Sequence, residues 1–307
     1  MNNLSIIMYH RVRDERDKSY PNIKSLSLSS FRYQLDYLLA NYKVLSYSDV
    51  ISAVQNNIHL DENSCWLTFD DGYKDQVENV LPELEKRKIK ASFFPPVSTS
   101  LGKKVLDVNK IHFILDAANE KELLYVIKDF WISNSENRDE DSFNQLLSNI
   151  DTNHRYDTEE VIIVKRLLQN ILNLDERNYL CDLLFKKYVT ENEAEFARDL
   201  YMNLDDLRKI KALGHEIGSH GYDHVWLGKE TYAVQENEIN SSVNFLKKEK
   251  LIDKNNWTMC YPYGSYNADT LSILNNLGCL IGLTSKPGFV SNDYKRLELC
   301  RWDTNDF

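Results

Sequence analysis

The sequence lacks the features that direct a protein to nucleic acids or membranes. Its 307 residues contain 37 Lys and Arg against 47 Asp and Glu, and no basic stripe that would track phosphates. Its clean apolar runs are short, such as Val161–Val164, whereas a membrane-spanning helix needs about 18 apolar residues. The first residues show no basic segment followed by an apolar one. We therefore expect a cytoplasmic protein with no transmembrane segment and no nucleic-acid partner.

Paired cysteine motifs and internal repeats are also missing. The five cysteines are odd in number and widely spaced, with no Cys-x-x-Cys, which predicts buried, reduced thiols. No repeat, low-complexity tract or linker is found. A chain of this length forms a sufficient core without a disulfide or a metal, and fits one large domain or one domain with an insertion.

Apolar strands alternate with amphipathic helices in both outer parts of the chain, which predicts a parallel α/β sheet or barrel. Residues 104–203 instead show helical periodicity with almost no strand signal. The charge follows this division, because residues 116–203 hold 10 basic and 19 acidic residues and the remainder is close to neutral. We interpret residues 104–203 as a helical insertion with a solvated acidic surface. The strands are expected at 5–9, 43–45, 65–69, 89–94, 215–219, 258–261 and 279–284.

Two groups of polar residues follow apolar strands, at the edge where parallel α/β folds place their active sites. Asp70 and Asp71 are adjacent, and a helix-capping role explains one of these carboxylates but not both. His220 and His224 are four residues apart and can grip one metal ion, although solvated or core histidines are the commoner explanation of a lone pair. One carboxylate and two imidazoles leave an open position on a divalent metal. The combination predicts metal-assisted hydrolysis of a carbonyl or phosphoryl group.

Three segments resemble the motifs of one enzyme family. Thr68–Tyr73, with the sequence Thr-Phe-Asp-Asp-Gly-Tyr, resembles the first motif of the polysaccharide deacetylase family (NodB-homology domain, carbohydrate esterase family 4). His220–His224 resembles the second motif, His-[Ser/Thr]-x-x-His, and Gly214–Ser219 matches its usual lead-in. Tyr261–Gly264 resembles the third motif.

The resemblance covers roughly residues 1–100 and 204–307. It implies an α/β fold, a distorted (β/α)7 TIM-like barrel of the NodB-homology type, which residues 1–103 and 204–307 would form. Residues 104–203 would be an all-helical insertion outside the family pattern, and a candidate lid or partner surface.

The resemblance also implies roles for individual residues. Asp71, His220 and His224 would bind a divalent metal, usually zinc in this family. Asp70 would be the general base that activates water at the metal. The backbone N–H of Tyr263 would join the metal in stabilising the oxyanion.

The sequence departs from the family pattern at three places. Gly221 replaces the Ser or Thr of the second motif, whose hydroxyl supports the loop. The arginine that pairs with the catalytic aspartate is missing near Met259–Tyr261; Arg301 is the candidate replacement, with a surface arginine as the alternative. The histidine that usually serves as general acid is missing too, and His10 is the candidate acid or substrate contact, with a structural core role as the alternative. The remaining histidines, His59, His112, His154 and His215, are expected to be structural.

The resulting hypothesis is a metal-dependent hydrolase that removes the N-acetyl group from an N-acetylated amino sugar, in a surface polysaccharide or its precursor. The substrate partner would be an N-acetylated sugar, an oligosaccharide or a sugar on a carrier. One alternative is a deformylase or another amide or imide hydrolase on the same fold. A second is an inactive carbohydrate-binding protein, suggested by the missing arginine and histidine.

Overall fold

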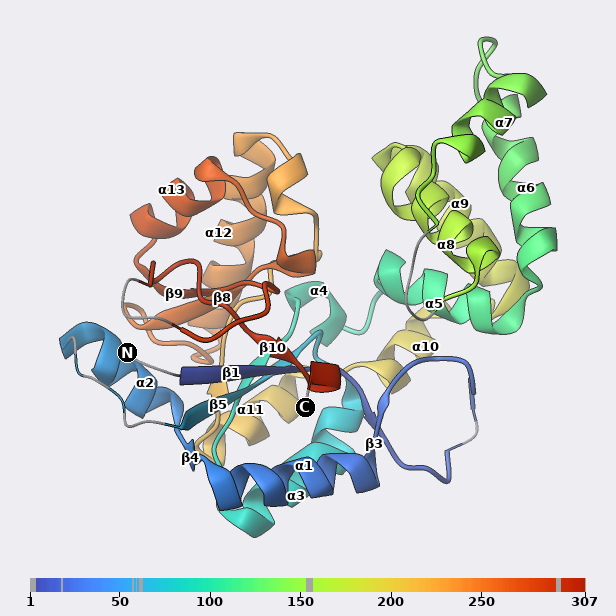
Figure 1. The fold of residues 1–307 in the computed structure, drawn as a ribbon. Coiled ribbons are helices and arrows are strands. Elements are labelled where there is room, and N and C mark those ends of the chain that lie inside the picture. Colours follow the sequence, from blue (N-terminus) through green and yellow to red (C-terminus); the bar gives the residue numbers. More distant parts are fainter. Residues whose placement is uncertain are drawn as a thin grey trace. The chain divides into compact units, whose positions relative to one another are not determined.

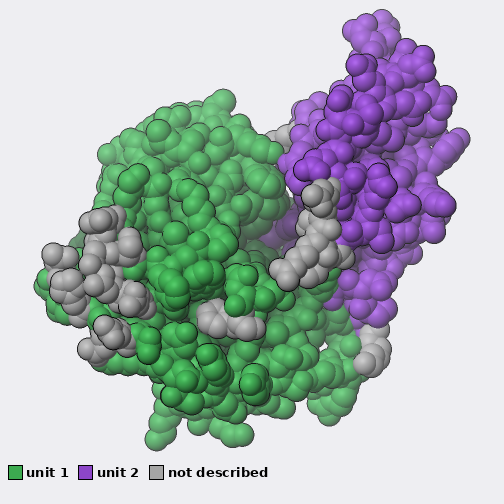
Figure 2. Space-filling model, viewed as in Figure 1, with its two compact units in different colours: residues 1–17, 24–104, 197–307 green, residues 18–23, 105–196 purple. Residues whose placement is uncertain are grey.

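The computed structural model describes residues 4–17, 19–56, 58, 60, 63–152, 157–290 and 294–306. The chain divides into two compact units, which Figure 2 shows in different colours. Unit 1 comprises residues 1–17, 24–104 and 197–307, and unit 2 comprises residues 18–23 and 105–196. Unit 2 thus begins and ends near the limits 104–203 expected for the insertion, and it also takes in a short segment from near the N-terminus.

Unit 1 is built on parallel strands, as the sequence predicts. A sheet runs in the order β10, β1, β5, β6, β7, with β4 also paired to β5. A parallel bridge from Ser219 to Met259 continues the pairing to β8 and β9, and a bridge from Leu283 to Leu299 leads back to the segment that carries β10. The pairings therefore return to β1, as in a small, irregular β/α barrel. The strands are β1 (Leu4–Tyr9), β4 (Lys43–Val44), β5 (Ser64–Asp70), β6 (Ser92–Phe94), β7 (Glu216–Ile217), β8 (Trp257–Cys260), β9 (Cys279–Leu283) and β10 (Trp302–Asp303).

The strands β1 and β5 form the centre of this arrangement. Every residue of both is buried, which is why they read as continuous apolar runs rather than as an alternating pattern. Their parallel register pairs Met8 with Thr68 and Tyr9 with Phe69. The two strands therefore end side by side, and the residues that follow them emerge at the same edge.

Amphipathic helices cover this sheet. In α1, Phe31, Leu35 and Leu38 recur at helical spacing and are buried, and the Ser27 hydroxyl caps the first turn by accepting the N–H of Ser30. Figure 1 shows α1 and α3 on one side of the β1–β5 pair and α12 and α13 on the other. The helices of unit 1 are α1 (Leu28–Asn41), α2 (Tyr47–Asn56), α3 (Leu81–Arg87), α4 (Val97–Ser100), α11 (Leu204–Ala212), α12 (Tyr232–Lys248) and α13 (Ala268–Asn276).

Several elements are shorter than the sequence pattern suggests. The spacing of Val77, Val80, Leu81 and Leu84 predicts one helix over about 74–88, whereas the structure has a π-helical turn at Gln76–Val80 before α3. The strand expected at 215–219 is reduced to the two residues of β7. Two further two-residue strands, β2 (Val12–Arg13) and β3 (Leu26–Ser27), pair with each other. Elements this short carry no periodicity that a sequence pattern can reveal.

Within the described residues of unit 2, the regular secondary structure is helical. Its core joins Phe113 of α5 to Phe185 of α9 and Phe196 of α10, and Tyr20 from the N-terminal segment packs against Phe113 at a ring distance of 4.7 Å. Its helices are α5 (Asp107–Ala117), α6 (Glu120–Ser133), α7 (Glu140–Ser148), α8 (Glu159–Arg166), α9 (Leu174–Tyr188) and the start of α10 (Glu193–Leu200). In the described part of the chain, the helices are too short or too polar to cross a membrane.

Candidate active site

The polar residues singled out by the sequence lie at the carboxyl ends of the strands in unit 1. Asp70 is the last residue of β5, and Cys260 is the last residue of β8. His10 follows β1 and His220 comes shortly after β7; Arg301 instead precedes β10, and its side chain reaches Asp70 at the end of β5. This is the edge at which parallel α/β barrels place catalytic groups.

Asp70 and Arg301 form a buried, two-pronged ion pair. Arg301 Nη1 donates to Asp70 Oδ1 at 3.0 Å, and Nη2 donates to Oδ2 at 2.8 Å. Burial raises the pKa of the Asp70 carboxyl, but Arg301, together with His220 and His10, outweighs burial, so the pKa lies below its usual value. The Asp70 carboxylate is therefore ionised near neutral pH.

The position of Arg301 is itself fixed by other contacts. Its Nε donates to the carbonyl oxygen of Thr284 at 2.8 Å, and its Nη1 also reaches the Thr68 hydroxyl at 3.2 Å. The side chain is 1% exposed. The structure thus places Arg301 against the catalytic candidate and not on the surface, which was the alternative left open by the sequence.

The thiol of Cys260 completes the surroundings of Asp70. Its Sγ donates to Asp70 Oδ2 at 3.3 Å and accepts from Arg301 Nη2 at 3.1 Å. Burial raises the pKa of this thiol, so it remains protonated and acts as a donor. Cys260 lies in the stretch where the family arginine was found to be missing, and that substitution was the sequence signal that could have identified it.

Asp71, His220 and His224 form a compact group of possible metal ligands. Asp71 Oδ1 lies 3.4 Å from Nε2 of His220 and 3.4 Å from Nε2 of His224. All three side chains are buried, and their ligand atoms lie within 4.8 Å of one another. His220 Nδ1 makes a 2.8 Å hydrogen bond to the carbonyl oxygen of Cys260, so Nε2 is the ring nitrogen that could bind a metal.

The electrostatics of this group favour positive charge. Burial raises the pKa of Asp71, but hydrogen bonds from His220 and His224 dominate and hold it well below its usual value. For His220, burial lowers the pKa, while Cys260, Asp71 and Asp70 together outweigh burial and raise it. For His224, burial prevails and the pKa falls. Asp70 and Asp71 bring two negative charges, and Arg301 pairs with Asp70, so the group around Asp71 suits a cation.

The backbone at the site is strained at three non-glycine residues. Asp71, His224 and Tyr263 have φ values of 68°, 59° and 57°, in the left-handed region that L-residues avoid. Such conformations cost about 1–3 kcal/mol each and tend to persist at functional sites. Two of the three are candidate ligands, and the third is the candidate oxyanion donor.

His10 and Tyr263 border the buried groups. The exposed His10 lies close enough that its charge lowers the pKa values of Asp70 and Asp71, as a smaller contribution than burial and the nearer partners. The Tyr263 ring lies 4.5 Å from the His224 ring and stacks on Trp226 at 4.1 Å. Gln76 donates to the carbonyl oxygens of both His10 and Asp70, at 2.9 and 2.6 Å, and so joins the ends of β1 and β5.

The family assignment rests on comparisons as well as on this geometry. A family model described as "Polysaccharide deacetylase" matches residues 57–106 and 184–281. The matched segments contain both aspartates, both histidines of the second motif and Tyr263. The resemblance to the polysaccharide deacetylase family is confirmed.

Individual relatives agree with this assignment. The Bacillus subtilis (strain 168) protein YxkH, to which a polysaccharide deacetylase activity is provisionally ascribed, is 27% identical over 93 residues. That match covers 30% of this chain and 33% of the relative. The polysaccharide deacetylase YxkH therefore shares only one part of its length with this chain.

Solved structures confirm the fold over nearly the whole chain. The Streptococcus pyogenes deacetylase PplD in complex with acetate matches with a TM-score of 0.61 at 18% identity, covering 98% of this chain and 92% of that one. IcaB from Ammonifex degensii matches with a TM-score of 0.59 at 17% identity, covering 98% and 91%. At such low identity these two structures establish the shared fold and not the substrate.

Two further groups near the site were not anticipated from the sequence. Gln76 and Glu238 lie in stretches that resemble ordinary polar faces of helices, so their burial could not be recognised. Of the histidines expected to be structural, His215 is buried between Ala91 and Glu85, which fits that role. His59 and His154 lie outside the described residues.

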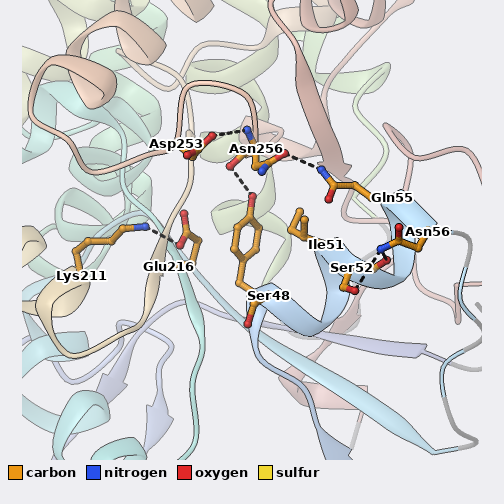
Figure 3. Close-up of a pocket in the computed structure, with 10 residues that line it drawn as sticks. Ser48, Ile51, Ser52, Gln55, Asn56, Lys211, Glu216, Asp253 and Asn256 are labelled. Carbon is orange, nitrogen blue, oxygen red and sulfur yellow. Dashed lines mark hydrogen bonds and ion pairs between the residues drawn. The ribbon is translucent and has the colours of Figure 1, made fainter.

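A polar pocket of about 310 Å³ lies at the other end of the strands. Glu216 begins β7 and Asn256 precedes β8, so these lining residues mark the amino ends of the strands. Figure 3 shows Lys211 reaching Glu216, and Asn256 lying between Gln55 and Asp253. In barrels of this type the amino-terminal face serves stability, so the catalytic chemistry belongs to the opposite edge.

Proposed function

We propose that the protein is a metal-dependent de-N-acetylase that acts on an N-acetylated amino sugar of a surface polysaccharide or its precursor. The observation that carries the proposal is the buried Asp70–Arg301 pair beside Asp71, His220 and His224. A general base and a three-residue ligand group then occupy one strand edge. The family match and the shared fold support a deacetylase in particular.

The chemistry of the donor set fits a divalent metal, for which zinc is our proposal. Asp71, His220 and His224 supply one oxygen and two nitrogen ligands, the combination found in catalytic zinc sites with an open position. The bond from His220 Nδ1 to a carbonyl oxygen orients this ligand in the usual way. When bound, such a metal polarises the scissile carbonyl and lowers the pKa of water.

Asp70 would take the proton of the attacking water. Its carboxylate is ionised because Arg301 lowers its pKa, and Oδ1, which accepts from Arg301 alone, retains a lone pair for the proton, whereas Oδ2 accepts from both Arg301 and Cys260. Arg301 holds the carboxylate in one orientation, which a general base requires. Cys260 adds a third donor and restricts rotation of the carboxylate.

Tyr263 and His10 would act on the substrate. The strained backbone at Tyr263 would aim its N–H at the developing oxyanion of the acetyl carbonyl. His10, exposed at the edge of the site, would contact the sugar or protonate the leaving amine. The Tyr263–Trp226 stack would border the sugar-binding side.

The other hypotheses from the sequence lead to different products. A deformylase that used the same residues would release formate. Another amide or imide hydrolase on this fold would release ammonia or open a ring. The inactive carbohydrate-binding alternative rested partly on the missing arginine, and Arg301 now pairs with Asp70. That contact supports an active enzyme.

The decisive experiment measures acetate release from a panel of N-acetylated sugar nucleotides and oligosaccharides. The panel is assayed with and without a chelator, and again after zinc is restored. We expect acetate release that the chelator abolishes and zinc restores. Formate or ammonia release in place of acetate would move the activity to another amide bond, and chelator-insensitive release would exclude the metal role.

A further inference from the structure

The loop that carries the two histidines is held by a carboxylate from another element. Oε1 of Glu238, in α12, accepts the backbone N–H of Tyr222 at 2.7 Å and that of Asp223 at 2.6 Å. A hydrogen bond from the backbone N–H of His224 also stabilises the charged form of this carboxylate. Glu238 is 6% exposed, so the bonds lie in a poorly solvated place. Charge-assisted bonds of this kind are about twice as strong as neutral ones.

Gly221 makes room for this carboxylate. Its φ is +78°, and a Cβ at this position would lie 2.8 Å from Glu238 Oε1. A side chain at position 221 would therefore meet the oxygen that binds the next two N–H groups. Gly221 is the residue that replaces the Ser or Thr of the second motif, so the missing hydroxyl and the inserted carboxylate occupy the same region.

A second residue on the same face of α12 supports the start of the loop. Ser242, one helical turn after Glu238, shares a 2.8 Å hydrogen bond with the Ser219 hydroxyl. The Ser219 hydroxyl in turn accepts the N–H of Gly221 at 3.3 Å. The two ends of the loop are thus tied to one helix face, on either side of His220.

We propose that Glu238 is a positioning residue that fixes the histidine loop for metal binding and, with Gly221, replaces the loop-supporting hydroxyl of the second motif. Glu238 touches neither the substrate nor the metal ligands' ring nitrogens. It acts through the backbone of residues 222–224, and so determines where His224, with its left-handed φ, places its ring. This inference rests on the proposed metal centre.

The test compares zinc affinity in three variants of the full chain, measured by competition with a chromophoric chelator. Groups that orient metal ligands typically change affinity by about 10–100-fold when they are removed. We expect Glu238→Ala to weaken zinc binding by about 100-fold and Glu238→Gln, which keeps an oxygen acceptor without the charge, by about 10-fold. The control Glu236→Gln, at an exposed position on the same helix, should match the wild type.

A double-mutant cycle tests the link to Gly221. Gly221→Ala should weaken zinc binding more in the wild-type background than in Glu238→Ala, because only the former retains the oxygen that the new Cβ would meet. The visible absorption of the cobalt-substituted protein should change in Glu238→Gln, which a role in folding alone would not produce.

The outcomes separate this inference from the function on which it rests. A wild-type chain that binds no zinc and releases no acetate would overturn the proposed function, and this inference with it. A wild-type chain that binds zinc, with equal affinity in Glu238→Gln and an unchanged cobalt spectrum, would overturn the role of Glu238 alone. The glutamine variant decides where Glu238→Ala does not fold.

Discussion

Arg301 forms a bidentate ion pair with Asp70, which lies 231 residues away in the sequence. One N–H group of Arg301 donates to each carboxylate oxygen. The pair joins the end of β5 to the residue before β10 and is almost wholly buried. It therefore links the two segments on either side of β1, and the same contact lowers the pKa of the proposed base.

Removal of Arg301 should affect both stability and pH dependence. Arg301→Met leaves a buried carboxylate without its partner, a change that typically costs about 3–5 kcal/mol of unfolding free energy. The pKa of Asp70 should then rise, because burial raises it and Arg301 is the main group that lowers it. We expect the acidic limb of the kcat/KM profile to move to higher pH. For Arg301→Lys, both the stability loss and the shift of the acidic limb should lie between those of the wild type and Arg301→Met, since an ammonium cannot form the bidentate pair.

Urea unfolding and pH–rate profiles check this prediction. The control is Arg16→Met, whose side chain is 90% exposed and whose ion pair with Asp14 contributes little. An acidic limb that is the same in Arg301→Met and in the wild type would show that Arg301 does not set the pKa of the base.

Substitution of the two adjacent aspartates should have different effects on turnover and on zinc binding. Asp70→Asn removes the proposed base and should lower turnover by about 10²–10⁴-fold while zinc stays bound. Asp71→Asn removes a proposed ligand and should release zinc as well as abolish turnover. Zinc content and acetate release are measured on the same preparations, with circular dichroism as a check on folding. Undiminished turnover in Asp70→Asn would exclude its role as base.

The sequence alone indicated which site residues follow strands, because strands are recognised from local patterns. Asp70 and Asp71 follow the apolar run of β5, His220 follows the short strand β7, and the parallel pairing of β5, β6 and β7 brings both to one edge. The fold class followed from the same alternation of strands and helices. These features depend on residues close together in the sequence.

The contacts of the remaining groups could not be predicted because they depend on distant parts of the chain, and for Arg301, the candidate partner of the aspartate, the surface alternative stayed open. Nothing near Arg301 distinguishes a buried guanidinium from an exposed one until the end of the chain is placed beside β5. Glu238 lies in the run Gln-Glu-Asn-Glu, which reads as the solvated face of a helix, yet it is buried. Cys260 had a local signal, the missing arginine, but its contact with Asp70 required the fold.

Two glycines offer a matched test of the oxyanion loop. Gly264 follows Tyr263 with a φ of +65°, and a Cβ there would lie 1.9 Å from the Ser285 hydroxyl oxygen. Gly278 has a φ of +73°, and a Cβ there meets no described atom within 4 Å. In both alanine variants, the Cβ in a left-handed backbone conformation should cost about 1–2 kcal/mol of stability. Only Gly264→Ala must also displace its neighbours, so only it should lower kcat/KM through movement of the Tyr263 N–H.

Thermal unfolding and acetate release distinguish the two glycine variants. Gly278→Ala should lose a little stability and keep wild-type kcat/KM. Gly264→Ala should lose more stability and, at temperatures where it is folded, retain a reduced kcat. Equal kcat/KM values in the two variants would argue against the proposed role of Tyr263.

His215 should make the stability of unit 1 depend on pH below neutrality. Its Nδ1 accepts the N–H of Ala91 at 3.2 Å, and its Nε2 lies 3.0 Å from Glu85 Oε1, so the neutral ring has a partner on each nitrogen. Burial lowers its pKa, Lys90 lowers it further, and Glu85 opposes them without prevailing. The folded state therefore binds the proton less readily than the unfolded state, whose histidine pKa is about 6.5.

The sign of the effect follows from that difference in proton binding. The stabilising contribution of neutral His215 is complete above the unfolded pKa and is lost as the pH falls through that value toward the lower folded pKa. Between pH 7.5 and 5.5, the unfolding free energy of His215→Gln should therefore fall less than that of the wild type. In Glu85→Gln it should fall more, because the carboxylate that favours the imidazolium is gone. Urea unfolding at the two pH values measures both, and parallel losses in all three proteins would show that His215 does not titrate in the fold.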